Sequence, residues 1–111
     1  MSTNSLIAVK TKTGKFKAAY CHYDGYPSGV GAILKEFYTT TENANALVDL
    51  NSFSSLRYNI NDIEVYNDEP DNNRVFNSVV GLLDYAEECF IQYVYLWEDQ
   101  SGGWIDYDVF E

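Results

Sequence analysis

The stretch YCHYDGYPSG, residues 20–29, separates two patterns of apolar residues that predict different secondary structures. Before it, apolar and polar residues alternate, which is typical of a half-buried strand. After it, apolar residues recur at i, i+3, i+4 and i+7, which is typical of one face of a helix. Gly25 and Pro27 interrupt both patterns, and these residue types are strong turn formers. We therefore predict a strand-to-helix corner at residues 20–29.

Two alternating segments lead up to the corner, at residues 6–12 and 15–23. Gly14 lies in the short polar turn between them, where glycine readily adopts a positive φ. Phe16, Ala18 and Tyr20 share one face of the second segment, because alternate residues of a strand point the same way. The two segments together predict a β-hairpin.

Two helices are predicted after the corner. Ser28 is a suitable N-cap for the first, whose apolar stripe runs through residues 30–37. Thr39 and Glu42 have the spacing of a capping box. They precede a second, shorter helix at residues 44–50.

The middle of the chain carries weaker patterns. Residues 63–66 suggest a short edge strand, and residues 67–73 form a polar loop without the ligand spacing of an EF-hand. The clearest helical stripe follows at residues 75–86, with Asn72 or Asn73 as its N-cap.

Two segments rich in aromatic and β-branched residues close the chain, at 90–98 and 103–110, and a glycine turn joins them into a second hairpin. Strands at both ends with helices between them predict an α+β fold. We expect a mainly antiparallel four-stranded sheet made of the two hairpins, with two or three helices on one face. The 111 residues are expected to form a single domain, 1–111.

Charge is distributed unevenly along a chain whose net charge is −10. Residues 1–35 hold five lysines against Asp24, whereas residues 36–111 hold sixteen acidic residues against two arginines. Direct nucleic-acid binding is disfavoured, because such sites neutralise phosphates with basic residues. No apolar run reaches the length of a membrane span, so no membrane partner is expected. Two cysteines are read as free thiols in a reducing compartment.

The corner concentrates residues that can carry chemistry. Cys21 adjoins His22, the only histidine, but neighbours on a strand point to opposite faces, so the imidazole does not activate that thiol. His22 and Asp24 are two residues apart and share a face if the strand continues that far, so the carboxylate either orients the imidazole in a site or helps to hold the corner together. The second interpretation is the simpler one. We predict no catalytic residue, no metal site and no cofactor.

Three glycines surround the start of the first helix, at positions 25, 29 and 31, and backbone amides at such a place can bind anions. Their spacing matches neither the P-loop nor the dinucleotide-binding fingerprint, and close backbone packing also explains them. The residues placed to contact a small ligand at the corner are Tyr20, His22, Asp24, Tyr26, Ser28 and Gly29.

Acidic and aromatic residues gather on the closing hairpin. Such a surface either imitates nucleic acid to a basic protein or is a solvated sheet face. Trp104 and Phe110 occupy alternate positions of the last strand with Asp106 and Asp108, so the four side chains share one face. Because two of them are large and aromatic, we expect a partner protein or a second copy of the chain to cover this face. The candidate partner-binding residues are Glu98, Asp99, Trp104, Asp106 and Asp108.

The motif YCHYDGYP at residues 20–27 resembles one found in small uncharacterised proteins of bacteriophages and prophages, which commonly read YCHWDGYP. The segment LNSFSSL at 50–56 and the hairpin residues YVYLW at 93–97 look like the same family's continuation. Tyr23 stands where tryptophan is usual, and the asparagine- and aspartate-rich middle departs from the pattern. The family has no established activity, so the resemblance implies a phage source and a fold rather than a mechanism. For a phage protein the expected location is the host cytoplasm.

Three hypotheses about function remain. The first is a non-enzymatic phage accessory protein that acts by protein–protein interaction, as an acidic inhibitor of a host defence or nucleic-acid-handling protein. The alternative is a small-ligand binder, of a nucleotide for example, that uses the corner at residues 20–31. An enzyme centred on His22 and Asp24 is the least favoured. The partner expected under the first hypothesis is a host protein, and the oligomeric state is left open.

Overall fold

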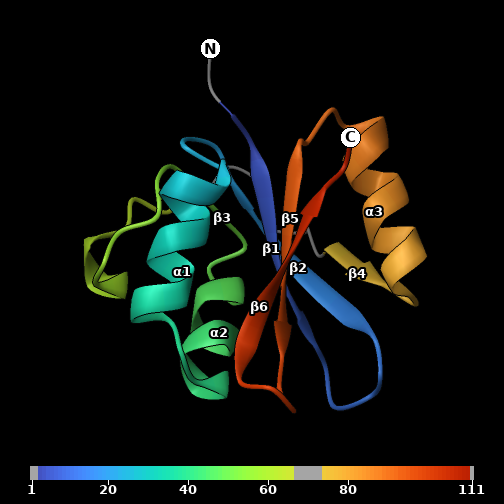
Figure 1. Cartoon of the computed structure of the whole chain (residues 1–111), viewed down its shortest axis with the longest axis horizontal. Helices are drawn as coiled ribbons and strands as arrows, with labels where there is room; N and C mark the ends of the chain where they lie inside the picture. Colours follow the sequence, from blue (N-terminus) through green and yellow to red (C-terminus); the bar gives the residue numbers. More distant parts are fainter. Residues whose placement is uncertain (1–2, 67–73, 111) are drawn as a thin grey trace.

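A mixed β-sheet forms the centre of the computed structural model, which describes residues 3–66 and 74–110. The strands follow the order β3-β2-β1-β5-β6, and β4 also pairs with β2, on the strand's N-terminal half (Figure 1). Their bounds are Ser5–Lys10 (β1), Phe16–Cys21 (β2), Ser52–Phe53 (β3), Arg74–Phe76 (β4), Tyr93–Glu98 (β5) and Gly103–Asp108 (β6).

Three α-helices flank the sheet. Their bounds are Ala32–Phe37 (α1), Thr41–Val48 (α2) and Val79–Glu88 (α3). A π-helical turn at Pro27–Gly31 (η1) leads from the corner into α1, and a single 3₁₀ turn at Ile60–Asp62 (η2) lies in the segment after β3. The α+β class predicted from the sequence is confirmed.

The predicted four-stranded antiparallel sheet is only partly correct. The two hairpins, β1–β2 and β5–β6, are antiparallel as expected, but β1 and β5 pair in parallel, and β3 and β4 extend the sheet beyond β2. Residues 6–9 of β1 are buried on both faces of the sheet. A continuous apolar run of this kind is typical of a central strand. In the sequence, alternating residues follow the run directly, so the whole segment resembles a half-buried strand.

The helices cover both faces of the sheet, which corrects the expectation that they lie on one face. Figure 1 shows α1 and α2 on one side of the sheet and α3 on the other. Ile7 of β1 packs in the cluster under α1 and α2, whereas its neighbours Leu6 and Ala8 pack in the cluster under α3. Because β1 is apolar on both faces, each face needs its own cover.

Three helix starts differ from the predicted ones. At the first, Ser28 lies inside η1 and is not its N-cap, because the turn begins at Pro27 after Tyr26 and has no side-chain cap. Ser78 caps α3 by accepting a hydrogen bond from Gly81 N at 3.0 Å, and Val75 belongs to β4 instead of the helix. Thr40 caps α2 through Asn43 N at 3.1 Å, so the predicted capping box at Thr39 is wrong by one residue. The predicted caps Asn72 and Asn73, with the predicted loop 67–73, lie outside the described residues.

Of the predicted edge strand at residues 63–66, a single bridge between Val65 and Phe53 is found. Within the described residues, no helix is long and apolar enough to cross a bilayer. The same residues contain no group of three or more histidine, cysteine, aspartate or glutamate side chains arranged to hold a metal ion.

Candidate functional site

The corner is held by main-chain contacts with three other parts of the chain. The amides of His22 and Tyr23 donate to the carbonyl of Ser54, at 3.1 and 3.0 Å. Gly25 N donates to Thr3 O at 2.8 Å, and the Tyr95 hydroxyl donates to Gly25 O at 2.6 Å inside the core. A Cβ atom at position 25 would lie 2.8 Å from Thr3 O, so only glycine fits there. Close packing of the main chain therefore explains why residue 25 is glycine.

The structure separates Cys21 from His22, as strand geometry predicts. Cys21 is buried in the cluster under α1 and α2, and this burial raises the pKa of its thiol to about 11. His22 follows directly after β2, and its Nδ1 is hydrogen-bonded at 2.8 Å to the hydroxyl of Tyr20, which packs against the cluster under α3. Both Cys21 and the exposed Cys89 are free thiols. The pair therefore has no geometry for nucleophilic catalysis.

The six candidate ligand-binding residues fall into two groups. Tyr20 and His22 belong to an aromatic cluster with Tyr23 and Tyr66, in which the His22 ring lies 5.8, 4.5 and 6.5 Å from the three tyrosine rings. The guanidinium of Arg74 lies 5.7 Å from the centre of the Tyr20 ring. The other group, on the α1 side, consists of Asp24, Tyr26, Ser28 and Gly29.

The second group borders two neighbouring hollows beside η1 and α1. Asp24 lines a hollow of 480 Å³ together with Arg57, Tyr58 and Asp62. Ser28 and Gly29 line the next hollow, of 420 Å³, which also reaches Tyr58. We call this pair of hollows, whose lining residues fall within 24–37 and 55–62, the corner hollow.

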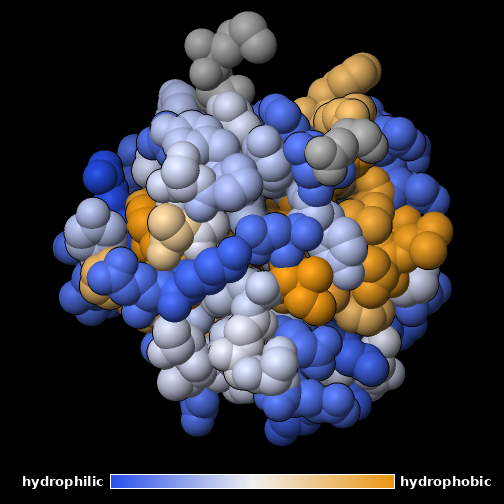
Figure 2. Space-filling view, viewed as in Figure 1, coloured by the Kyte–Doolittle hydropathy of each residue, from blue (hydrophilic) through white to orange (hydrophobic). Residues whose placement is uncertain are grey.

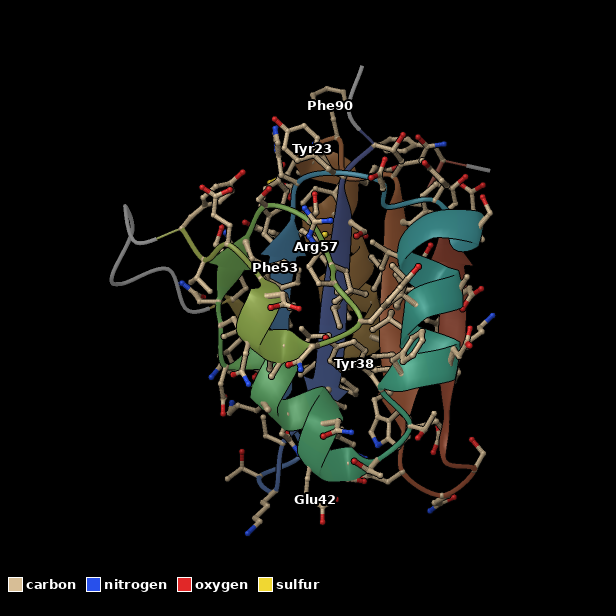
Figure 3. The ribbon with its side chains drawn as sticks, turned by 90° about the vertical axis from the view of Figure 1, so that its left-hand side faces the viewer. Tyr23, Tyr38, Glu42, Phe53, Arg57 and Phe90 are labelled. Carbon is tan, nitrogen blue, oxygen red and sulfur yellow. The ribbon has the colours of Figure 1, made fainter. Side chains whose placement is uncertain are left out.

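Two residues of the corner hollow, Arg57 and Tyr58, were not among the sequence candidates. The Tyr38 hydroxyl donates to Arg57 O at 2.7 Å, and Tyr58 stacks on Phe37 with 4.6 Å between ring centres. Figure 3 shows Arg57 between Tyr23 at the corner and Tyr38 at the end of α1. These residues lie in the segment with the weakest sequence pattern, and their role comes from contacts with α1 that are distant in the chain.

The candidate partner-binding residues of the closing hairpin do not form one open surface. Trp104 is only 9 % exposed, packs edge-on against Trp97 and donates its indole N–H to Tyr38 O at 2.8 Å. Asp106 forms an ion pair with Lys35 at 2.9 Å. The helices α1 and α2 therefore cover much of the face on which a partner protein or a second copy is predicted to bind. The other members are the half-buried Glu98, Asp99, which accepts a hydrogen bond from Thr41, and the exposed Asp108.

The opposite face of β6 is less well covered. Two hollows of 410 and 200 Å³ lie between α3 and β6 and meet at Tyr107. We call them the α3–β6 groove, and its apolar lining includes Val79, Leu83, Ile105, Tyr107 and Val109. Five acidic residues also line the groove, Asp84, Glu87, Glu98, Asp99 and Asp108, together with one basic residue, Lys10.

Further apolar side chains are exposed near this groove. Val80 is 68 % exposed on α3, and Phe90 and Phe110 are 80 % and 48 % exposed with their rings stacked at 6.5 Å. Figure 2 shows hydrophobic atoms gathered on the α3 side of the molecule, beside β6. Scattered exposed apolar residues are normal, but a contiguous group edged by charges is typical of an interaction surface.

Comparison of the chain with protein-family models, with curated proteins and with solved structures finds no match in any of the three. The candidate sites therefore depend on the geometry described above.

Proposed function

We propose that the chain is a non-enzymatic phage accessory protein that acts in the host cytoplasm by binding a basic host protein through the α3–β6 groove. The observation that carries the proposal is the groove itself, where apolar side chains lie beside five carboxylates and one lysine, Lys10. An interface commonly has an apolar centre and a polar rim, and this surface offers both.

The two parts of the surface contribute differently. Burying an exposed side chain such as Val80 or Phe90 stabilises a complex by roughly 1.5–3 kcal/mol. The carboxylates of the groove outnumber its one lysine and belong to a chain of net charge −10, so they select a partner of opposite charge and speed its approach. Proteins that handle nucleic acid present basic surfaces for phosphate, so a host protein of this class, including a defence nuclease, fits an acidic inhibitor.

The test is affinity isolation from a bacterial lysate with matched variants. Val80→Lys places a cation beside the groove, whereas Tyr58→Lys places one beside the corner hollow, at a residue with the same exposed fraction of 68 %. We expect a protein that is retained by the wild type and by Tyr58→Lys, is lost with Val80→Lys, and is released by moderate salt. Circular dichroism confirms that both variants fold. Equal capture by all three proteins, or no specific capture, contradicts the proposal.

The second candidate is small-ligand binding in the part of the corner hollow that has a volume of 480 Å³ and is lined by Asp24, Arg57, Tyr58 and Asp62. One guanidinium beside two carboxylates suits a ligand that carries both charges better than a polyphosphate. A thermal-shift screen with nucleotides and amino acids tests it. A ligand at 100 times its Kd stabilises the fold by about 2.7 kcal/mol, which raises the melting temperature, and Arg57→Ala should abolish the rise. No rise with any compound contradicts this candidate.

A further inference from the structure

Strand β6 has a free edge among the described residues, because it pairs with β5 on one side and ends the sheet on the other. The register pairs Tyr95 with Asp106 and Leu96 with Ile105. Val109 N donates to Gln92 O at 2.8 Å, and this pair continues the same register. Hydrogen-bonded pairs alternate in an antiparallel ladder, so the odd-numbered residues of β6 bond to β5.

It follows that the main-chain N–H and C=O groups of Trp104, Asp106 and Asp108 point away from β5. No hydrogen bond from these groups to another element is found within the described residues. Figure 1 shows β6 in front of the sheet, with α1 and α2 on one side of it and α3 on the other. An edge of this kind presents the donors and acceptors that an added strand needs.

The side chains along this edge differ between its two faces. Asp106 and Asp108 lie on the face toward α1, whereas Ile105 and Tyr107 lie on the face toward the α3–β6 groove. A strand added beside β6 would place alternate side chains next to these two sets. One set of its side chains would meet carboxylates, and the other would extend the apolar lining of the groove.

A second copy of the chain does not suit this edge. Antiparallel pairing of two β6 strands about Asp106 would bring the two Asp106 side chains together, and like charges directly opposite each other destabilise a sheet. Each copy would also bring a net charge of −10. Aspartates on an edge strand are one way in which proteins prevent such self-association.

We propose that β6 receives an extended segment of the partner as an additional strand, and that this segment alternates basic and apolar side chains. The inference rests on the proposed function, because the apolar side chains of the segment extend the apolar lining of the α3–β6 groove to which the partner binds. The basic half faces Asp108 and competes with Lys35 for Asp106. The three outward-facing residues, at positions 104, 106 and 108, limit the paired segment to about five to seven residues.

The probe is an acetylated and amidated decapeptide of alternating lysine and valine, and the measurement is amide hydrogen exchange of the full chain by NMR. We expect the peptide to slow exchange at the amides of Trp104, Asp106 and Asp108 at least tenfold. The amides of Ile105 and Tyr107, which already bond to β5, should change little. A peptide with the same residues in two blocks, five lysines then five valines, has equal charge and should give no such pattern.

A pair of charge variants controls for attraction to the acidic chain as a whole. Asp108→Lys and Glu42→Lys change the net charge equally, but Glu42 is an exposed residue in the first turn of α2 and does not line the α3–β6 groove. The alternating peptide should bind Asp108→Lys at least tenfold more weakly than Glu42→Lys. Equal binding to both variants, or equal binding of the block peptide, overturns strand addition.

Two further outcomes would also overturn strand addition. If a lysate protein depends on Val80 but the peptide protects no amide of β6, strand addition is overturned and the groove proposal stands. If sedimentation shows a dimer of the chain alone, with protected amides at 104, 106 and 108, the edge belongs to a second copy and the inference is again overturned.

Discussion

The hydroxyl of Tyr95 shows how single polar atoms hold the corner to the sheet. It lies in the core and donates to Gly25 O at 2.6 Å, and burial is the main cause that raises the pKa of this phenol. Since Gly25 is pressed against the main chain of residues 3 and 4, this hydrogen bond joins the corner to β5 and to the start of β1. A buried acceptor that loses its donor costs the desolvation of that acceptor.

Tyr95→Phe should therefore lower the free energy of unfolding by about 1–3 kcal/mol, because Gly25 O loses its partner in the core. Urea denaturation followed by fluorescence measures the change. Tyr93→Phe is the matched control, since Tyr93 is half-buried and no hydrogen bond of its hydroxyl is found within the described residues. An equal loss in both variants would show that the hydroxyl of Tyr95 has no special role.

The buried thiol of Cys21 predicts a loss of stability at alkaline pH. Its folded pKa of about 11 lies above the ordinary value of 9.0, so between these values the unfolded chain releases a proton that the folded chain keeps. The free energy of unfolding therefore falls as the pH rises from 9 toward 11, by about 1.4 kcal/mol at pH 10 from this group. Below pH 9 the contribution is constant.

Unfolding in urea at pH 7, 9 and 10 checks this, with Cys21→Ala as the reference that lacks the thiol. The difference in stability between the two proteins should shrink by about 1.4 kcal/mol between pH 7 and pH 10. A thiol reagent should label the exposed Cys89 of the native protein at once and Cys21 only on unfolding. A difference that stays constant with pH would contradict the prediction.

At the scale of elements, the start of α2 shows that two neighbouring threonines can both fit the sequence pattern of an N-cap although only one of them caps the helix. Thr39 and Thr40 both precede acidic Glu42, but the hydroxyl that accepts the hydrogen bond from Asn43 N belongs to Thr40, whose backbone is extended. The sequence pattern alone favours Thr39, because a capping box needs Glu at the third position after the cap. The connection from α1 decides between the two threonines.

Thr40→Ala should destabilise the protein by about 1 kcal/mol, the usual effect of losing an N-cap oxygen. Thr39→Ala should change stability by less than about 0.5 kcal/mol, as an exposed residue outside the cap. Thermal unfolding of the two variants side by side measures both. A larger loss for Thr39→Ala would restore the capping box predicted from the sequence.

For the whole molecule, charge is the dominant surface property. Two ion pairs, Lys17–Asp49 at 3.0 Å and Lys35–Asp106 at 2.9 Å, are found among the described residues, and partly exposed pairs of this kind contribute little. Repulsion among the remaining carboxylates opposes the compact state. The same negative field favours a basic partner.

Raising sodium chloride from 20 to about 500 mM should therefore stabilise the free protein, because it screens repulsion over distances beyond the Debye length of ~4 Å at that salt. The urea midpoint at both salt concentrations measures the effect. Glu42→Lys, which reduces the net charge by two, should show a smaller rise. A fall in the midpoint with salt would indicate that attractive pairs outweigh the repulsion.

Much of the local structure could be predicted from residue patterns. The alternation at residues 15–23 and the aromatic segments at 90–98 and 103–110 predicted both hairpins. The helical stripe through Leu82 and Ala86 predicted α3, although its start was placed too early. These patterns are local, so they depend little on the rest of the chain.

The short strands β3 and β4 could not be predicted in this way. Each has two or three residues, too few for a periodic pattern, and each exists because β2 offers a free edge. Arg57 and Tyr58 were missed for a similar reason. Their surroundings are made by α1, which lies about twenty residues earlier in the chain.

The sequence by itself determined the α+β class, the two hairpins, the corner and the separation of Cys21 from His22, because period-two and period-3.6 patterns act within a few residues. Only the tertiary structure decided which side of the closing hairpin is exposed. Alternation shows that Trp104 and Asp106 share a face, but not that α1 and α2 cover that face while α3 leaves the groove beside Ile105 open. Which face is covered depends on packing between elements distant in the chain, and no local pattern encodes it.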